Sequence, residues 1–333
     1  MVANQGWAQD PRMSFESDLL SVLETYFREE AISYIKNSSA AVLAARYCEV
    51  HTRRIKPTPR RVHFSEELHD SLGKLSRVDQ TAWGTVFHLR HLFESGADVT
   101  PYLSKRVASS ESKDPMLWDY GLHHFHLNEE LGRSGFVERA DHLLFALVSA
   151  EEVFFVDVRA HQDPERLLWV RQDLLTIMDS NWPGISKDWV LHGVQGDTLT
   201  DTQKKELRRK NVNHVRVLGK QAIGPLGGGV MADGSSTLCK FWAAKLLFEV
   251  EQHESYFSTQ AEEVRAALRA SGIDVAGGME LRLVPLDSLD PMPEVVELLG
   301  AESCLSKGLS RMGFAVVEAT TGAPIVVSLT QKP

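Results

Sequence analysis

Residues 142–161 read HLLFALVSAEEVFFVDVRAH, and this stretch decides the fold that the sequence predicts. The apolar runs on either side of residues 149–152 predict two antiparallel strands joined by a four-residue loop. That loop sets a register in which Val148 lies opposite Val153. Counting back along both strands gives three further apolar pairs, Leu147 with Phe154, Phe145 with Val156, and Leu143 with Val158. A slip of one residue would destroy this matched face, so the register is well specified.

The other face of the same hairpin is predicted to be polar. In this register His142 lies opposite Arg159, with His161 nearby. An additional strand is predicted within residues 120–128, where His124 and His126 alternate with apolar residues. If this strand is the next one in the sheet, one face gathers five basic side chains: His124, His126, His142, Arg159 and His161. Such a set is unusual for an ordinary solvated sheet face and marks a candidate site.

The rest of the chain predicts an α+β protein in four parts. Apolar spacing predicts helices within residues 14–50, and a strand at 61–64 precedes a helix capped by Ser65. Later elements are expected as helices near 164–180, 235–270 and 295–306, a strand near 279–285, and a closing hairpin over 314–329. The predicted parts are a helical N-terminal region (1–57), a module with an antiparallel sheet (58–192), a glycine-rich linker (193–228) and a C-terminal α/β domain (229–333).

Composition narrows the class of protein. The chain has 333 residues and a net charge of −9, which argues against a dedicated sequence-independent nucleic-acid binder but not against one local basic patch. Two basic segments, 53–61 and 204–220, read either as such patches or as solvated faces. No apolar run reaches the roughly 18–20 residues that span a bilayer. The three cysteines form no CxxC motif, so we expect reduced thiols in a cytoplasmic protein with no membrane partner.

The order of these elements resembles the RelE superfamily of toxins, over about residues 60–182. The opening strand and helices, from Val62 to Phe93, resemble the start of those proteins. Residues 117–120 (LWDY) resemble the family's tryptophan-led strand, and His142 stands where the family usually has arginine. Residues 158–161 (VRAH) resemble the closing strand of the YoeB branch, in which a histidine near the end acts in RNA cleavage. The resemblance implies an RNA substrate, free or ribosome-bound, and an antitoxin or other protein partner.

These residue types suit metal-independent RNA cleavage. Histidine can give or take a proton near neutral pH, and arginine can hold a phosphate through two hydrogen bonds. We expect His161 as general acid and either His124 or His126 as general base, with His142 in support. Either Arg159 or Arg139 is expected to hold the phosphate. Two further arginines, Arg60 and Arg61, are expected to bind RNA.

Two alternatives remain open at the level of sequence. His124 and His126, with His142 or His161 and Asp157, could bind zinc, although their spacing matches no strong zinc signature. A non-catalytic binding module with the same fold, acting through a protein partner, would have no need of proton-transfer groups. We expect no cofactor, because the glycine-rich segment 224–229 lacks the GK[ST] ending of a phosphate loop.

Overall fold

The computed structural model describes residues 12–165, 167–196, 198–275, 278–285, 288, 296–298, 314–322 and 325–327. The fold is a mixture of helices and small sheets, and the chain divides into two compact units. The terminal unit comprises residues 1–47 and 241–333, and the central unit comprises residues 48–240. The boundaries fall within α2 (Ala40–Arg53) and α8 (Thr237–Thr259). This division replaces the four consecutive parts predicted from the sequence, because the two ends of the chain belong to one unit.

The central unit is built on a four-stranded sheet in the order β1-β4-β3-β2. Its strands are β1 (Arg61–Phe64), β2 (Leu122–His126), β3 (His142–Val148) and β4 (Glu152–Ala160). β2, β3 and β4 pair antiparallel, as predicted, but β1 pairs parallel to β4. The expectation of a wholly antiparallel sheet is therefore wrong at its first strand.

The predicted hairpin register is correct near the loop and wrong beyond it. Val148 pairs with Val153 and Leu147 with Phe154, but the register shifts by one residue between Phe145 and Ala146. This β-bulge places two β4 residues opposite one β3 residue. The pairs beyond the bulge are Phe145 with Asp157, Leu143 with Arg159, and His142 with Ala160. The predicted pairing of His142 with Arg159 is consequently wrong.

Ser65 satisfies the backbone that the bulge leaves unpaired. The residue between the two registers is Val156, and its carbonyl accepts a hydrogen bond from the Ser65 hydroxyl at 2.6 Å. The same hydroxyl accepts the Leu68 N–H at 2.9 Å and so caps α3 (Glu66–Val78), as the sequence predicted. A buried carbonyl without a partner is costly, so this one side chain stabilises both the helix start and the bulge.

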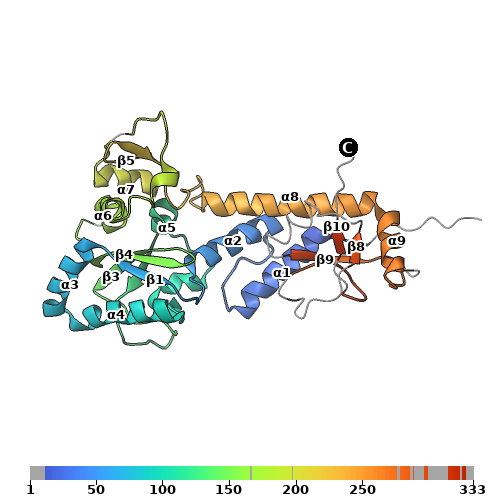
Figure 1. The fold of residues 1–333 in the computed structure, drawn as a ribbon, viewed down its shortest axis with the longest axis horizontal. Coiled ribbons are helices and arrows are strands. Elements are labelled where there is room, and N and C mark those ends of the chain that lie inside the picture. The colour runs from blue at the N-terminus through green and yellow to red at the C-terminus, as the bar shows by residue number, and fades with distance from the viewer. Residues whose placement is uncertain are drawn as a thin grey trace, which may run out of the picture. The chain divides into compact units, whose positions relative to one another are not determined.

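Helices cover both faces of the central sheet (Figure 1). α3 and α4 (Gln80–Ser95) pack on the face that carries Phe125 and Phe155. α5 (Pro115–Tyr120) and α6 (Asp173–Asn181) pack on the face that carries Phe145 and Val156. The predicted polar face is therefore largely apolar and covered. Residues 117–120, expected to enter a strand, belong to helix α5 instead.

Residues 193–228, predicted as a linker, contribute to the apolar core that lies between the sheet and the helices α5 and α6. This segment contains α7 (Asp201–Arg209), β5 (Arg216–Leu218) and β6 (Gln221–Ile223), and Leu218, Ile223 and Leu226 are buried in that core. Gly227 lies so close to the carbonyl oxygen of Leu117 that a Cβ would overlap it, which explains a glycine beside α5. Short 3₁₀ helices complete the unit: η1 (Thr100–Tyr102), η2 (Lys105–Ala108), η3 (Leu168–Val170) and η4 (Lys187–Trp189).

The terminal unit joins both ends of the chain. Asp18, in α1 (Phe15–Glu29), accepts hydrogen bonds from the Leu283 N–H and the Arg282 guanidinium, which tie that helix to β7 (Leu281–Pro285). The other elements are α9 (Ala261–Ala270), β8 (Val296–Leu298), β9 (Phe314–Glu318) and β10 (Ile325–Val327).

Two C-terminal predictions differ from this arrangement. Residues 296–298 form a strand rather than the predicted helix, whose other residues, 295 and 299–306, lie outside the described ranges. β9 pairs with β7 and β10 with β8, in place of the predicted closing hairpin.

Cys48 and Cys239 are free thiols, while Cys304 lies outside the described residues. Among the described helices, none is both long and apolar enough to cross a bilayer.

Replacing Ser65 with alanine should lower the free energy of unfolding by about 2–4 kcal/mol, because the helix cap and the partner of the Val156 carbonyl are lost together. Urea denaturation measures this loss. Ser76→Ala, which removes a surface hydroxyl from the same helix, should change stability by less than about 0.5 kcal/mol. Equal effects of the two changes would contradict the role given to Ser65.

Candidate functional site

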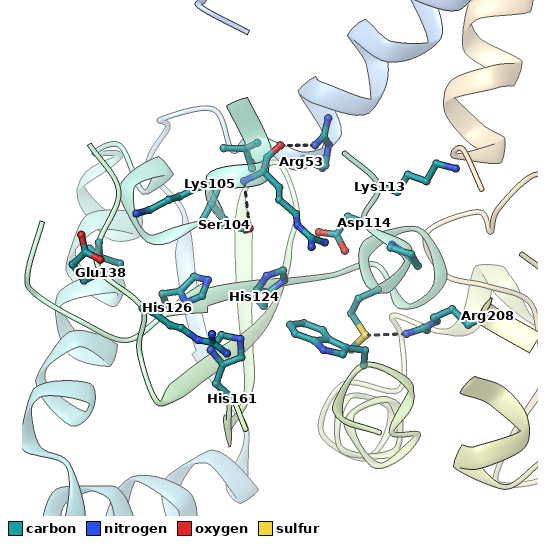
Figure 2. Close-up of a pocket in the computed structure, with 18 residues that line it drawn as sticks. Arg53, Ser104, Lys105, Lys113, Asp114, His124, His126, Glu138, His161 and Arg208 are labelled. Atoms are coloured by element: carbon teal, nitrogen blue, oxygen red, sulfur yellow. Dashed lines mark hydrogen bonds between the residues drawn. The ribbon is translucent and has the colours of Figure 1, made fainter. Parts of the chain in front are cut away.

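A pocket of about 770 Å³ lies in the central unit beside the edge strand β2 (Figure 2). β2 supplies one wall, and η2 and the start of α5 supply others. The polar and aromatic side chains that line it are Arg53, Ser104, Lys105, Arg106, Lys113, Asp114, His124, His126, Glu138, Arg139, His161, Trp169 and Arg208. Six of these are lysine or arginine and two are acidic, so the pocket is cationic although the chain as a whole is acidic.

Three of the predicted histidines meet in this pocket (Figure 2). His124 and His126 lie on the same face of β2, because side chains alternate along a strand. The ring centroids of His126 and His161 are 5.4 Å apart, and those of His124 and His126 are 6.1 Å apart. Trp169 completes the group, with its ring centroid 4.9 Å from that of His124. The sequence therefore identified the histidines that lie together.

Two predicted members of the site lie elsewhere. His142 is on the opposite face of the sheet, and its Nδ1 is 2.8 Å from a carboxylate oxygen of Asp79. Arg159 is held by two carboxylates, at 2.6 Å from Asp157 and 3.0 Å from Asp173. His142 takes the other face because β2 pairs with β3 so that His126 lies opposite Leu143, the neighbour of His142. The bulge places Arg159 on the face of the histidines, but the two carboxylates hold its guanidinium. Neither side chain lines the pocket.

Of the three other arginines predicted to meet RNA, only Arg139 lines the pocket. Arg60 and Arg61 lie at β1, on the sheet edge opposite to β2. Arg60 donates hydrogen bonds to the carbonyls of Lys56, Thr58 and Ser149, and Arg61 pairs with Glu152 at 2.9 Å. The fold thus gives these two arginines structural partners and separates them from the histidines.

Three cations of the pocket have free charged groups. Within the described part of the chain, the side-chain nitrogens of Lys105, Arg106 and Arg139 make no hydrogen bond or ion pair, and all three residues are exposed. By contrast, Arg208 pairs with Asp119 at 2.5 Å, and Lys113 donates to the carbonyl of Asp233. Unpaired cations beside imidazoles form a site that favours an anionic group such as a phosphate.

The surroundings of the β2 histidines keep them neutral. Burial first, and then the charges of neighbouring basic groups, including Arg139 and Lys105, lower the pKa of His126 from 6.5 to about 4. Burial also lowers the pKa of His124. The Nδ1 atoms of both rings are shielded from water, and within the described residues they have no hydrogen-bond partner. Both imidazoles are therefore neutral at neutral pH, which is the form that a general base requires.

His161 has a different environment from the β2 histidines. Its Nδ1 lies 3.0 Å from the carbonyl oxygen of Ala140, and its backbone N–H donates to the carbonyl of Asp141 at 2.7 Å. A carbonyl only accepts hydrogen bonds, so this contact assigns the proton to Nδ1. Nε2 is then the nitrogen left for proton exchange, and the backbone contacts fix the ring orientation.

Sequence reasoning missed several residues of the pocket. Lys105, Arg106 and Asp114 lie in a polar segment between predicted elements, and Trp169 lies in what was expected to be a helix. The adjacent Lys105 and Arg106 are a short basic signal in the sequence, beside the two longer basic segments 53–61 and 204–220. Each of those segments contributes one lining residue, Arg53 and Arg208 respectively.

The zinc alternative finds no support in the arrangement of side chains. Among the residues that the structure describes, no group of three or more His, Cys, Asp or Glu side chains is placed to hold a metal ion. His142 is on the other face of the sheet, and Asp157 is engaged by Arg159. The shell with His142 therefore cannot form, and the shell with His161 would require Asp157 to leave Arg159.

The chain was also compared with known proteins. No family model, no curated protein and no solved structure matches it.

The depressed pKa of His126 predicts a pH dependence of stability. The unfolded chain binds protons at this histidine from about pH 6.5 downward, whereas the folded chain does so only near pH 4. The folded state therefore loses stability as pH falls through that interval. His126→Asn should reduce the drop in melting temperature between pH 7 and pH 4.5. Ser104→Ala, a pocket change without a titrating group, should leave the drop unchanged, and an equal drop in all three proteins would refute the assignment.

Proposed function

We propose that this pocket is the active site of a metal-independent endoribonuclease. The observation that carries the proposal is the meeting of three imidazoles with three unpaired cations in one pocket. RNA cleavage at its own 2′-hydroxyl requires a base, an acid and positive charge at the phosphate, and it requires no external reactant. Each of these requirements has a candidate side chain within the pocket.

The proposed reaction assigns one proton transfer to each side of the phosphate. Neutral His126 accepts the proton of the 2′-hydroxyl, and the 2′-oxygen attacks the adjacent phosphorus. The bond from phosphorus to the 5′-oxygen breaks, and that oxygen takes a proton from Nε2 of the His161 imidazolium. The products are a 2′,3′-cyclic phosphate and a free 5′-hydroxyl. His124 lies 6.1 Å from His126 between ring centroids and is the alternative base.

The unpaired cations would stabilise the charge that develops on the phosphate. Lys105, Arg106 and Arg139 reach the pocket from η2 and from the segment before β3. Arg139 takes the phosphate-binding role, since Arg159 is neutralised by two carboxylates. Preorganised charge of this kind needs no rearrangement during the reaction, which is why it lowers a barrier effectively.

We also propose that the central unit is a RelE-like toxin module. The strand β1, the helices α3 and α4, and the three strands β2, β3 and β4 follow the order on which the resemblance rests, with the short helix α5 between α4 and β2. The substrate would be RNA, free or ribosome-bound, in the cytoplasm. A toxin–antitoxin or phage-defence setting and a protein partner such as an antitoxin follow from the same resemblance.

The test uses the full-length protein with end-labelled single-stranded RNA, in EDTA, with and without ribosomes. Cleavage is expected in EDTA, with a 2′,3′-cyclic phosphate at the new end. His161→Ala and His126→Ala should each slow cleavage by about 10²-fold or more, as loss of a proton-transfer group does. His91→Ala is the matched control, because His91 is exposed on α4 and lies outside the pocket.

The other outcomes separate the alternatives. Cleavage that EDTA abolishes would replace the proposal with a metal-dependent reaction. Undiminished cleavage by His161→Ala would remove that residue from the mechanism. If no RNA is cleaved with or without ribosomes, and toxicity in cells survives loss of the histidines, the non-catalytic binding module is the better account.

A further inference from the structure

Asp114 is an unexpected residue for a phosphate pocket. Its carboxylate lines the pocket beside His124, where a negative charge opposes phosphate binding. One oxygen, Oδ1, accepts the backbone N–H of Leu117 at 3.1 Å and caps α5. Within the described residues, Oδ2 makes no hydrogen bond or ion pair. A carboxylate with a free oxygen in a pocket calls for a ligand that donates hydrogen bonds.

Trp169 provides an aromatic surface in the same pocket. It is half-buried and lines the pocket together with the side chain of Met116. Nucleobases bind to proteins by stacking on aromatic rings, while polar groups at the base edge give selectivity. The pocket volume of about 770 Å³ is ample for a base as well as its phosphate.

We propose that Asp114 and Trp169 form a base subsite that selects guanine in single-stranded RNA. Guanine presents two adjacent N–H donors, N1–H and the N2 amino group, and a carboxylate can accept from both. Adenine and cytosine place an acceptor nitrogen beside their single amino group, and uracil flanks its N3–H with two carbonyl oxygens. Each of these three bases would set an acceptor against Asp114, which costs binding free energy.

The same contact restricts the substrate to unpaired RNA. N1–H and the N2 amino group of guanine are the groups that pair with cytosine in a duplex, so Asp114 can reach them only when the base is unpaired. This inference rests on the proposed function, because the bound phosphate is the one that Lys105, Arg106 and Arg139 would hold. The carboxylate adds selectivity that these cations alone cannot provide, since phosphate contacts do not distinguish bases.

Calorimetric titration with 3′-mononucleotides tests the subsite without cleavage. The full-length protein is expected to bind guanosine 3′-monophosphate about tenfold more tightly than the adenosine, cytidine and uridine compounds, the usual value of a bidentate base contact. Inosine 3′-monophosphate, which lacks the N2 amino group, should bind more weakly than the guanosine compound. Asp114→Asn should bring all five affinities to within about threefold, because the amide replaces one acceptor with a donor while asparagine still caps α5.

Asp98→Asn is the matched control, since Asp98 caps Thr100 and does not line the pocket. It should retain the guanosine preference. Equal affinities in the unmodified protein, no binding of any nucleotide, or a preference that survives Asp114→Asn would each overturn the inference. RNA cleavage without base preference would remove the subsite and leave the nuclease. Guanosine-selective binding without RNA cleavage would remove the nuclease and leave the subsite.

Discussion

The candidate site depends on the β-bulge between Phe145 and Ala146. At the edge of the sheet His126 pairs with Leu143, so His124 and His126 share a face with Leu143. The bulge brings Arg159 opposite Leu143, and His161, two residues further on, reaches that same face. Without the extra residue His161 would point to the other face. Ser65 supplies the hydrogen bond that the bulged backbone needs, which links the first strand and helix of the unit to the geometry of the pocket.

Local patterns predicted much of the central unit. Alternation located the three antiparallel strands, Ser65 was recognised as a cap, and the grouping of His124, His126 and His161 was expected. A bulge leaves no mark in an apolar run such as residues 153–156, and the sequence does not give the register between β2 and β3. The pairing partner of Arg159 and the face of His142 could therefore not be deduced. Pairing between distant segments was equally hidden. The joining of α1 to β7 depends on Asp18, which looks like any other surface acid in a sequence.

The pocket is assembled at some cost in stability. In the pocket, two imidazole nitrogens are buried without partners among the described residues, and three unpaired cations share the opening with two acids. An ordinary protein surface would disperse these charges, and an ordinary core would pair the nitrogens. Titrating groups with perturbed pKa values that gather in a cavity are a physical sign of function. Their unfavourable environment in the empty site is relieved when a ligand of opposite charge binds. Because the chain as a whole is negatively charged, an anionic ligand would be attracted to this cationic pocket rather than to the rest of the surface.

The most direct measurement is a crystal structure of the protein with a short RNA that carries a 2′-O-methyl group and cannot be cleaved. Our account predicts one phosphate within hydrogen-bond distance of His126 and His161, contacted by at least one of Lys105, Arg106 and Arg139. RNA bound on another surface, with the histidine pocket empty, would contradict the account.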